Sequence, residues 1–281
     1  MAIDDLKSDA ARIIIQELNE LILKLKDKDL KISSWYGCFD LSDDTASFER
    51  INRGLHYKPI ESSVDDKNFP WFLYWEIVWI IIHAEFKTHH KVLDLGGSSS
   101  LFSYYLASKG LDVTTVDLQE NLVENANNVA LSMGWNLKNH VMDMRSLSFN
   151  HQFDHITSIC VYEHIPMYVR VEINKHIKER LVPGGRFSIT FDYKNPSRFA
   201  RISSPDDVFE QFIRPSGLKI RGNVVFQDAG TNYLFHPFYH SSTPWKYKID
   251  QVKQHNFNLL DLFKKKKSND YTFGALFLEK K

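Results

Sequence analysis

The stretch that decides the fold is Lys91–Ser100, with the sequence KVLDLGGSSS. Its first half, KVLDL, is a short apolar run of the kind that forms a buried strand, and its second half, GGSSS, contains only small residues. From Leu101 onward, apolar residues recur at helical spacing. A strand, a turn of small residues and a helix N-terminus let a ligand come very close to the backbone. We therefore expect a ligand-binding turn here.

The rest of the chain after Leu101 alternates between strand and helix patterns. We expect strands at 112–116, up to 142, from 153 and at 186–193, with helices at about 120–133 and through Val169, Ile173 and Ile177. A Pro-Gly turn, LVPGG at 181–185, precedes the strand at 186–193, and further strand candidates are LKIRGNVVF at 218–226 and YTFGALFLEK at 271–280. Ser204, followed by Pro205 and two aspartates, is typical of a helix start. This order predicts a mostly parallel sheet with helices on both faces.

The part before the organising stretch is expected to be helical at both ends. Apolar residues between 3 and 28 follow helical spacing, residues 31–66 have no clear period, and 69–86 is an aromatic-rich segment suited to a buried helix. We expect two parts, an N-terminal helical extension or lid at 1–68 and one domain at 69–281. The domain would carry a substrate-side insert at about 227–270, helical from Thr243 onward.

Composition excludes several classes of protein. The 281 residues contain 35 Lys plus Arg and 35 Asp plus Glu, so no net charge favours nucleic acid or membrane as a partner. The two cysteines, Cys38 and Cys160, have no partner pattern, which argues against disulfides or a zinc site and fits a cytoplasmic location. The acidic N-terminus is not a secretory signal. The apolar run Trp71–Ala84 is shorter than the ~20 residues that span a bilayer.

Ligands of such sheets bind at the carboxyl ends of the strands, near the point where the strand order reverses. The residues at these ends are Gly96, Asp117, Asp143, the segment Cys160–His164 and Asp192. We expect the fold to bring them together.

Two ligand classes compete for the small-residue turn. A dinucleotide loop has the pattern G-x-G-x-x-G, and here the three positions hold Gly96, Ser98 and Leu101. A leucine at the third position fits a pyrophosphate site poorly, which disfavours an NAD-dependent oxidoreductase. The spacing of Asp94, Gly96, Ser98 and Ser100 instead matches the pattern D-x-G-x-G-x-G of an S-adenosylmethionine loop, with serines in place of two glycines.

At these residues the sequence resembles the class I S-adenosylmethionine-dependent methyltransferases. The resemblance runs from about Trp71 to the C-terminus and rests on an ordered set of motifs, namely VLDLGGSSS, VTTVD, VMDM, FDHITSICVYEHI and LVPGGRFSITF. It implies a Rossmann-like α/β fold with a seven-stranded, mostly parallel sheet, and S-adenosyl-L-methionine as the cofactor.

The resemblance also implies roles for individual residues. Asp94 and the backbone at Gly96, Gly97 and Ser98 would hold the methionine end of the cofactor. Asp117, with Leu118 beside it, would accept hydrogen bonds from the ribose hydroxyls, and Asp143 with Met144 would meet the adenine. Ile159, Cys160 and Glu163 would line the floor near the sulfonium.

A methyl acceptor that attacks through oxygen also needs a base. His164 is the first candidate for the general base because histidine titrates near neutral pH and the segment follows a strand end. His236, His240 and Asp192 are the alternatives. His236 and His240 flank Pro237 and have no third ligand nearby in sequence, so we expect no metal there.

The sequence thus predicts a cytoplasmic methyltransferase of small molecules, with O-methylation of a sugar, glycan precursor or other hydroxylated metabolite as the leading hypothesis. An N- or C-methyltransferase of a small metabolite is one alternative. The other is a methyltransferase-like partner or regulatory protein that binds the cofactor weakly, because serine does not take positive backbone φ values as freely as glycine. Neither nucleic acid nor membrane is an expected partner, and the oligomeric state is open.

Overall fold

The computed structural model describes residues 1–33, 55–56, 71–195, 202–222, 226–234 and 270–281. The main sheet has seven strands in the order β5-β4-β3-β6-β7-β10-β8, and β9 pairs with β10 off this path. The strands are β3 (Lys91–Leu95), β4 (Asp112–Asp117), β5 (Leu137–Val141), β6 (Phe153–Ser158), β7 (Leu181–Tyr193), β8 (Lys219–Ile220), β9 (Tyr233–Leu234) and β10 (Asp270–Glu279). The expected Rossmann-like sheet is confirmed.

The strand β3 lies at the point where the strand order reverses. It pairs in parallel with β4 on one side and with β6 on the other, and the chain then adds β5 beyond β4 and β7 beyond β6. Among the described strands of this sheet, the antiparallel pairings are those of β10 with β7, β8 and β9. Because ligands bind these sheets where the order reverses, the turn after β3 occupies the binding position.

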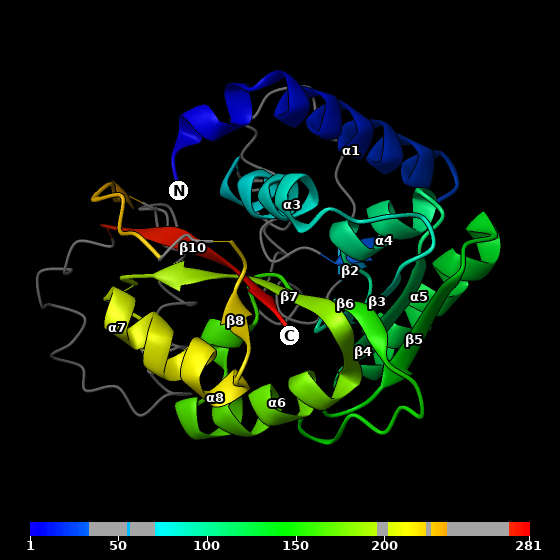
Figure 1. Cartoon of the computed structure of the whole chain (residues 1–281). Helices are drawn as coiled ribbons and strands as arrows, with labels where there is room; N and C mark the ends of the chain where they lie inside the picture. The colour runs from blue at the N-terminus through cyan, green and yellow to red at the C-terminus, as the bar shows by residue number, and fades with distance from the viewer. Residues whose placement is uncertain (34–54, 57–70, 196–201, 223–225, 235–269) are drawn as a thin grey trace, which may run out of the picture.

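Helices cover both faces of the sheet (Figure 1). One layer contains α1 (Asp9–Asp27), α3 (Trp71–Ala84), α4 (Leu101–Ser108) and α5 (Glu120–Met133), whose buried side chains form one apolar core. The helix α1 buries one stripe that includes Leu18, Ile22 and Leu25, as its spacing predicts. Its preceding turn η1 (Ile3–Lys7) is anchored by a 2.7 Å hydrogen bond from Trp75 Nε1 to Asp5 Oδ2. The N-terminal helix is therefore packed on α3.

The opposite layer contains α6 (Met167–Arg180), α7 (Pro205–Val208), a π-helical turn at Phe209–Ile213 and α8 (Arg214–Ser216). Together with the apolar side chains of β6 and β7 they enclose a second core. The predicted helix start at Ser204 is confirmed: its hydroxyl accepts a hydrogen bond from Asp207 N, and the Asp207 carboxylate accepts one from Ser204 N. Because helices bury both faces of the sheet, a ligand can reach it at the ends of the strands.

Three sequence expectations were wrong in detail. The Pro-Gly segment at 181–185 is not a separate turn but belongs to β7, where the pairing with β6 shifts register between Phe153 and His155. Gly184, at φ 74°, donates from its N–H to Lys280 O, so the extra residues form a bulge that β10 binds. The strand expected at 218–226 is only two residues long in β8, and the helix expected at 3–28 is divided at Ser8.

The region expected to be irregular, 31–66, contributes a small antiparallel pair of β1 (Ile32–Ser33) and β2 (Leu55–His56). Most of that region, and the helix expected from Thr243, lie outside the described residues.

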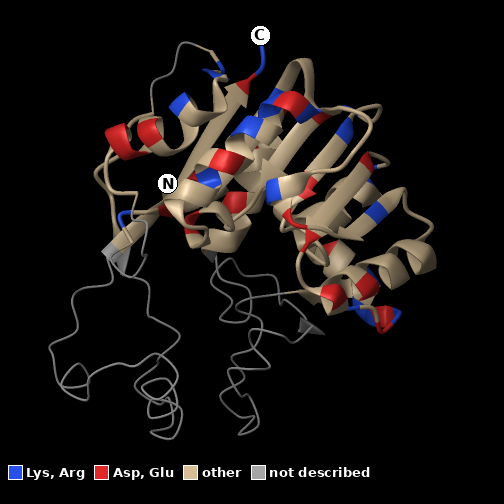
Figure 2. Cartoon of the chain, turned by 90° about the horizontal axis from the view of Figure 1, so that it is seen from below, with Lys and Arg blue, Asp and Glu red and all other residues tan. Residues whose placement is uncertain are grey.

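Charged residues of both signs are interspersed along the ribbon in the view of Figure 2. Among the helices that the structure describes, none combines the length and the apolar character needed to cross a bilayer.

Candidate functional site

The carboxylate of Asp94 is the polar anchor under the turn after β3. It is almost completely buried and accepts hydrogen bonds from Ser103 Oγ at 2.6 Å and Thr157 Oγ1 at 2.9 Å. Burial raises the pKa of Asp94 to about 7, although the two hydroxyl donors oppose this rise. Asp94 therefore ties together β3, α4 and β6 from below the turn, and it changes charge near neutral pH.

The two glycines of the turn are required for different reasons. Gly97 lies so close to Asp94 that a Cβ atom there would stand 1.8 Å from Oδ2, which no side chain permits. Gly96 has a φ of +75°, and a Cβ would lie 2.9 Å from Cγ2 of Val161. The turn can pack against the carboxylate and the segment after β6 only because both positions lack side chains.

The serines that replace glycines do not strain the turn. Ser98 and Ser100 have no positive φ; only Ser99, at φ 62°, takes the left-handed conformation. Ser100 is the N-cap of α4, and its hydroxyl accepts a hydrogen bond from Ser103 N at 3.0 Å. Ser98 is buried, and its hydroxyl contacts Thr115 Oγ1 at 2.7 Å. The serines thus add bonds that glycine could not make, which removes the physical reason for expecting a weak cofactor loop.

A short N-terminal segment docks on this turn, which the sequence patterns did not indicate. Both the backbone N–H and the hydroxyl of Ser33 donate to Ser99 O, at 2.7 and 3.1 Å. The side-chain amide of Asn125 in α5 donates to Lys31 O and to Ser99 Oγ, both at 2.9 Å. Ser99 Oγ in turn donates to Leu122 O at 2.6 Å. These contacts hold Ser99 in its positive-φ conformation from three sides.

Asp117 closes β4 beside the turn. Its Oδ1 accepts a hydrogen bond from Gln119 N at 3.0 Å, and burial raises the pKa of its carboxyl. The next residue, Leu118, is 68% exposed although it is apolar. Asp117, with Leu118 beside it, is the pair expected at the ribose, and both residues stand at the strand end next to the turn.

Asp143 follows β5 and begins the 3₁₀ turn η2 (Met144–Ser146). Its carboxylate accepts from Arg145 N at 2.8 Å and from the Arg145 guanidinium, and these contacts lower the pKa of Asp143. Asp143 is therefore the N-cap of η2 as well as the acid that follows β5. Met144 is partly buried against the second core. The two carboxylate oxygens of Asp143 can still accept further hydrogen bonds.

The segment after β6 carries Ile159, Cys160, Glu163 and His164. Cys160 has a positive φ of 55°, and its N–H donates to Thr190 Oγ1 of β7 at 3.1 Å. Glu163 and His164 lie in the 3₁₀ turn η3 (Tyr162–His164), with 3.7 Å between Glu163 Oε1 and His164 Nε2. The Glu163 side chain is fully buried and that of His164 is partly exposed. His164 is thus the most solvent-exposed of these four residues.

Two further acids join this strand end from other elements. Asp192, at the end of β7, is buried and accepts a hydrogen bond from Asn195 Nδ2 at 2.6 Å. Glu76 projects from α3 and is completely buried. Burial and the nearby carboxylates of Glu163 and Asp192 raise the pKa of Glu76 well above its usual range. Burial, followed by these carboxylates, likewise raises the pKa of the Cys160 thiol. Glu76 was missed as a site residue, although a single acid in an apolar helix was a signal.

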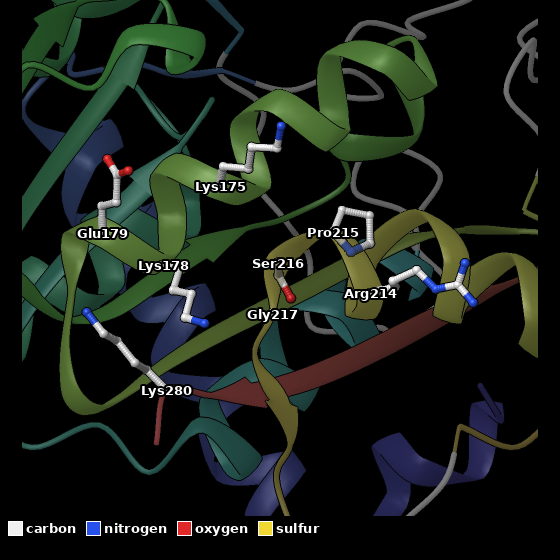
Figure 3. Close-up of a pocket in the computed structure, with 8 residues that line it drawn as sticks. All are labelled: Lys175, Lys178, Glu179, Arg214, Pro215, Ser216, Gly217 and Lys280. Atoms are coloured by element: carbon white, nitrogen blue, oxygen red, sulfur yellow. The ribbon is translucent and has the colours of Figure 1, made fainter.

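The alternative bases His236 and His240 lie outside the described residues. A cavity of about 420 Å³ opens elsewhere, between α6 and α8 (Figure 3). Its charged lining includes Lys175, Lys178, Arg214 and Lys280, none of which is an expected site residue. Lys280 follows β10 where it pairs with the start of β7, so this cavity is at the other edge of the sheet from the turn after β3.

A family model described as "Methyltransferase domain" matches residues 92–185, which hold the turn and the ends of β3, β4, β5 and β6. Among curated proteins, the chain is 33% identical over 139 residues to a ubiquinone biosynthesis O-methyltransferase of Coxiella burnetii. That match covers 45% of this chain and 58% of the relative. The chain therefore spans less than two thirds of the length of the curated relatives that it matches.

Solved structures show the same fold. The YcgJ protein of Bacillus subtilis matches with a TM-score of 0.53 at 18% identity, covering 74% of this chain and 99% of YcgJ. TehB of Haemophilus influenzae matches with a TM-score of 0.50 at 20% identity, covering 72% of this chain and 62% of TehB.

Proposed function

We propose that the chain is a class I S-adenosylmethionine-dependent methyltransferase that methylates an oxygen atom of a small hydroxylated molecule. One observation carries the proposal: β3, β4, β5 and β6 end at one edge of the sheet, each followed by a residue suited to one part of the cofactor. The resemblance to a ubiquinone biosynthesis O-methyltransferase supports oxygen as the acceptor atom. It also favours a hydroxylated ring over the sugar or glycan precursor.

The residues present fit the cofactor in size and charge. Because Gly96 and Gly97 have no side chains, the turn packs closely against Asp94 and Val161. Asp117 presents a carboxylate, one oxygen of which accepts a hydrogen bond from Gln119 N. A carboxylate binds two adjacent hydroxyls well through its two oxygens. Leu118 and Met144 would pack on either side of an adenine, and Asp143 retains acceptor capacity for its amino group.

When bound, S-adenosylmethionine supplies an electrophilic methyl group, whose C–S bond breaks as the C–O bond to the acceptor forms. The contribution of the chain is alignment and the exclusion of water. Ile159 and Cys160 would line the pocket beside the sulfonium and the acceptor oxygen. The hydroxyl proton passes to a base, and His164 is the proposed acceptor because it is the most exposed titratable group of the segment after β6.

The experiment is transfer of tritium from methyl-labelled S-adenosylmethionine to a panel of acceptors. The panel contains ring compounds with two adjacent hydroxyls, sugars, and matched ring compounds whose hydroxyls are already methylated. We expect label on the free ring hydroxyl and none on the fully methylated control. Label on nitrogen or carbon, or on sugars alone, would contradict the assignment of the acceptor. His164→Gln should reduce turnover at neutral pH without changing cofactor affinity, and an unchanged pH profile would exclude its role as the base.

A further inference from the structure

The turn between β3 and α4 contains a serine in a backbone conformation that serine resists. Ser100 N donates to Gly97 O at 3.1 Å, which closes a β-turn, and the third residue of that turn, Ser99, has a φ of +62°. Type II turns need a positive φ at this position and therefore favour glycine there. A residue with a Cβ atom meets a steric penalty in this region. Ser99 therefore keeps its conformation because contacts with other parts of the chain hold it.

The segment Lys31–Ser33, which follows α1, supplies the first of these contacts. Both the N–H and the hydroxyl of Ser33 donate to Ser99 O, at 2.7 and 3.1 Å. The neighbouring Ile32 is buried in the apolar core of the N-terminal layer, so it anchors the segment. The carbonyl oxygen of the strained residue is thus bound by a segment that lies 66 residues earlier in the chain.

Asn125 of α5 connects this segment to the turn. Its Nδ2 lies 2.9 Å from both Lys31 O and Ser99 Oγ, and it lies 3.1 Å from the hydroxyl of Tyr104 in α4. Tyr104 is buried, and its hydroxyl also donates to Lys31 O at 3.4 Å. One side-chain amide therefore joins α4, α5, the turn and the N-terminal segment. Its removal would deprive three oxygen atoms of a donor.

We propose that Asn125 and Ser33 are positioning residues of the cofactor turn. They hold Ser99 in its left-handed conformation and thereby set the path of the backbone that meets the methionine end of S-adenosylmethionine. The inference rests on the proposed function, because it takes this turn as the cofactor site. The same contacts join the turn to the segment Lys31–Ser33, so cofactor binding and docking of that segment strengthen each other by the same factor.

A purely structural role for these contacts predicts a different result. Contacts that only stabilise the fold would lower the free energy of unfolding when lost, and the cofactor affinity of the folded protein would stay the same. Contacts that position the turn would weaken that affinity when lost, even in a protein that is still folded. A residue at position 99 that takes positive φ without strain would then restore the affinity, and glycine is that residue.

The first test compares Asn125→Ala with Asn128→Ala by calorimetric titration of S-adenosylmethionine. Asn128 is an exposed residue of the same helix, so both substitutions raise the helix propensity of α5 equally, and only the first removes the bridging amide. We expect Asn125→Ala to weaken cofactor binding about 10-fold and Asn128→Ala to leave it unchanged. Equal cofactor affinities of the two folded variants would overturn the inference.

The double variant Asn125→Ala/Ser99→Gly tests whether Asn125 acts through the conformation of Ser99. We expect its cofactor affinity to return to within about threefold of the wild-type value, because glycine takes positive φ freely. The double variant should still unfold at a lower urea concentration than the wild type, since it lacks the 2.6 Å hydrogen bond from Ser99 Oγ to Leu122 O. An affinity as weak as that of Asn125→Ala would overturn the positioning role.

Amide hydrogen exchange separates this inference from the proposed function, because it is measured with and without the cofactor. Without cofactor, the Ser33 amide, which donates to Ser99 O, should exchange about 10-fold faster in Asn125→Ala than in Asn128→Ala. In the wild type, saturating S-adenosylmethionine should slow this exchange. A wild-type chain that binds the cofactor without any change in Ser33 exchange would refute this inference alone. A wild-type chain that binds no S-adenosylmethionine would refute the proposed function as well.

Discussion

Replacing Gly97 with alanine tests how tightly the cofactor turn is built on Asp94. The added Cβ would lie 1.8 Å from Asp94 Oδ2, the atom that accepts the 2.6 Å hydrogen bond from Ser103. Ordinary contact requires more than 3.4 Å, so the carboxylate or the turn must move by over an ångström. Either movement breaks the bond to Ser103, and Thr157 loses its alignment with Oδ1.

The expected cost has two parts. Overpacking of a buried position costs about 1–3 kcal/mol, and loss of a hydrogen bond to a charged or partly charged buried group costs about 1.5–3 kcal/mol. We therefore expect Gly97→Ala to lower the free energy of unfolding by about 3–5 kcal/mol. Because the turn is displaced, the variant that still folds should bind S-adenosylmethionine on the order of 100-fold more weakly.

The assay is urea unfolding followed by circular dichroism, with calorimetry for the cofactor. Gly110→Ala is the control: its φ is +84°, but a Cβ there would meet nothing within 4 Å. It should cost only the backbone strain of about 1–2 kcal/mol and leave cofactor affinity unchanged. A Gly97→Ala protein whose unfolding free energy lies within 1 kcal/mol of the Gly110→Ala protein would refute the reasoning.

Three further predictions concern charge and the serine positions. His155 is buried with its pKa lowered to about 3, chiefly by burial, so below pH 6.5 the unfolded chain binds a proton that the folded chain does not. The free energy of unfolding, measured by urea titration, should therefore fall by about 2 kcal/mol between pH 7.5 and pH 5. A His155→Gln variant whose free energy of unfolding falls equally over this pH range would contradict this. Asp117→Ala should weaken S-adenosylmethionine binding by about 2 kcal/mol through loss of charge-assisted bonds; an unchanged calorimetric Kd would remove its ribose role. Ser98→Gly restores the family glycine, yet it should lower stability by about 1 kcal/mol and leave the cofactor Kd unimproved, because the Ser98 hydroxyl bonds Thr115 without positive φ. A tighter Kd in that variant would show that the serine does hinder the cofactor.

The parts of the fold that local pattern determines were predictable from the sequence. The strand at Lys91–Leu95, the helix that follows it and the helix at Glu120–Met133 were expected with nearly the observed bounds. The strand is a short continuous apolar run, and both helices carry apolar residues at helical spacing. The bulge in β7 was not predictable, because a Pro-Gly segment reads as a turn unless the antiparallel partner β10 is known.

In the site, too, features set by neighbouring residues were predictable, and features set by contacts far away in the sequence were not. Asp94, Gly96 and Asp117 could be named because strand-end acids and small turns are local features. Which serine of the turn takes positive φ could not be read from composition: the doubt fell on Ser98 and Ser100, whereas Ser99 is the strained residue. Contacts with Ser33 and Asn125, far away in sequence, keep it in place.

Glu76 illustrates why the remaining part was missed. In the sequence it interrupts an apolar helix, and its meaning depends on Cys160 and Glu163, which lie more than eighty residues later. Only the packing of α3 against the ends of β6 and β7 brings these groups together. Periodicity identifies which face of a helix is buried, but not what that face meets.

The most direct measurement of the central claim is calorimetric titration of S-adenosylmethionine into the wild-type chain at neutral pH. If the turn after β3 and Asp117 form a working cofactor site, one molecule binds per chain with a saturable heat. A titration without saturable binding at millimolar cofactor would contradict the claim, and the methyltransferase assignment of this chain's activity would fall with it.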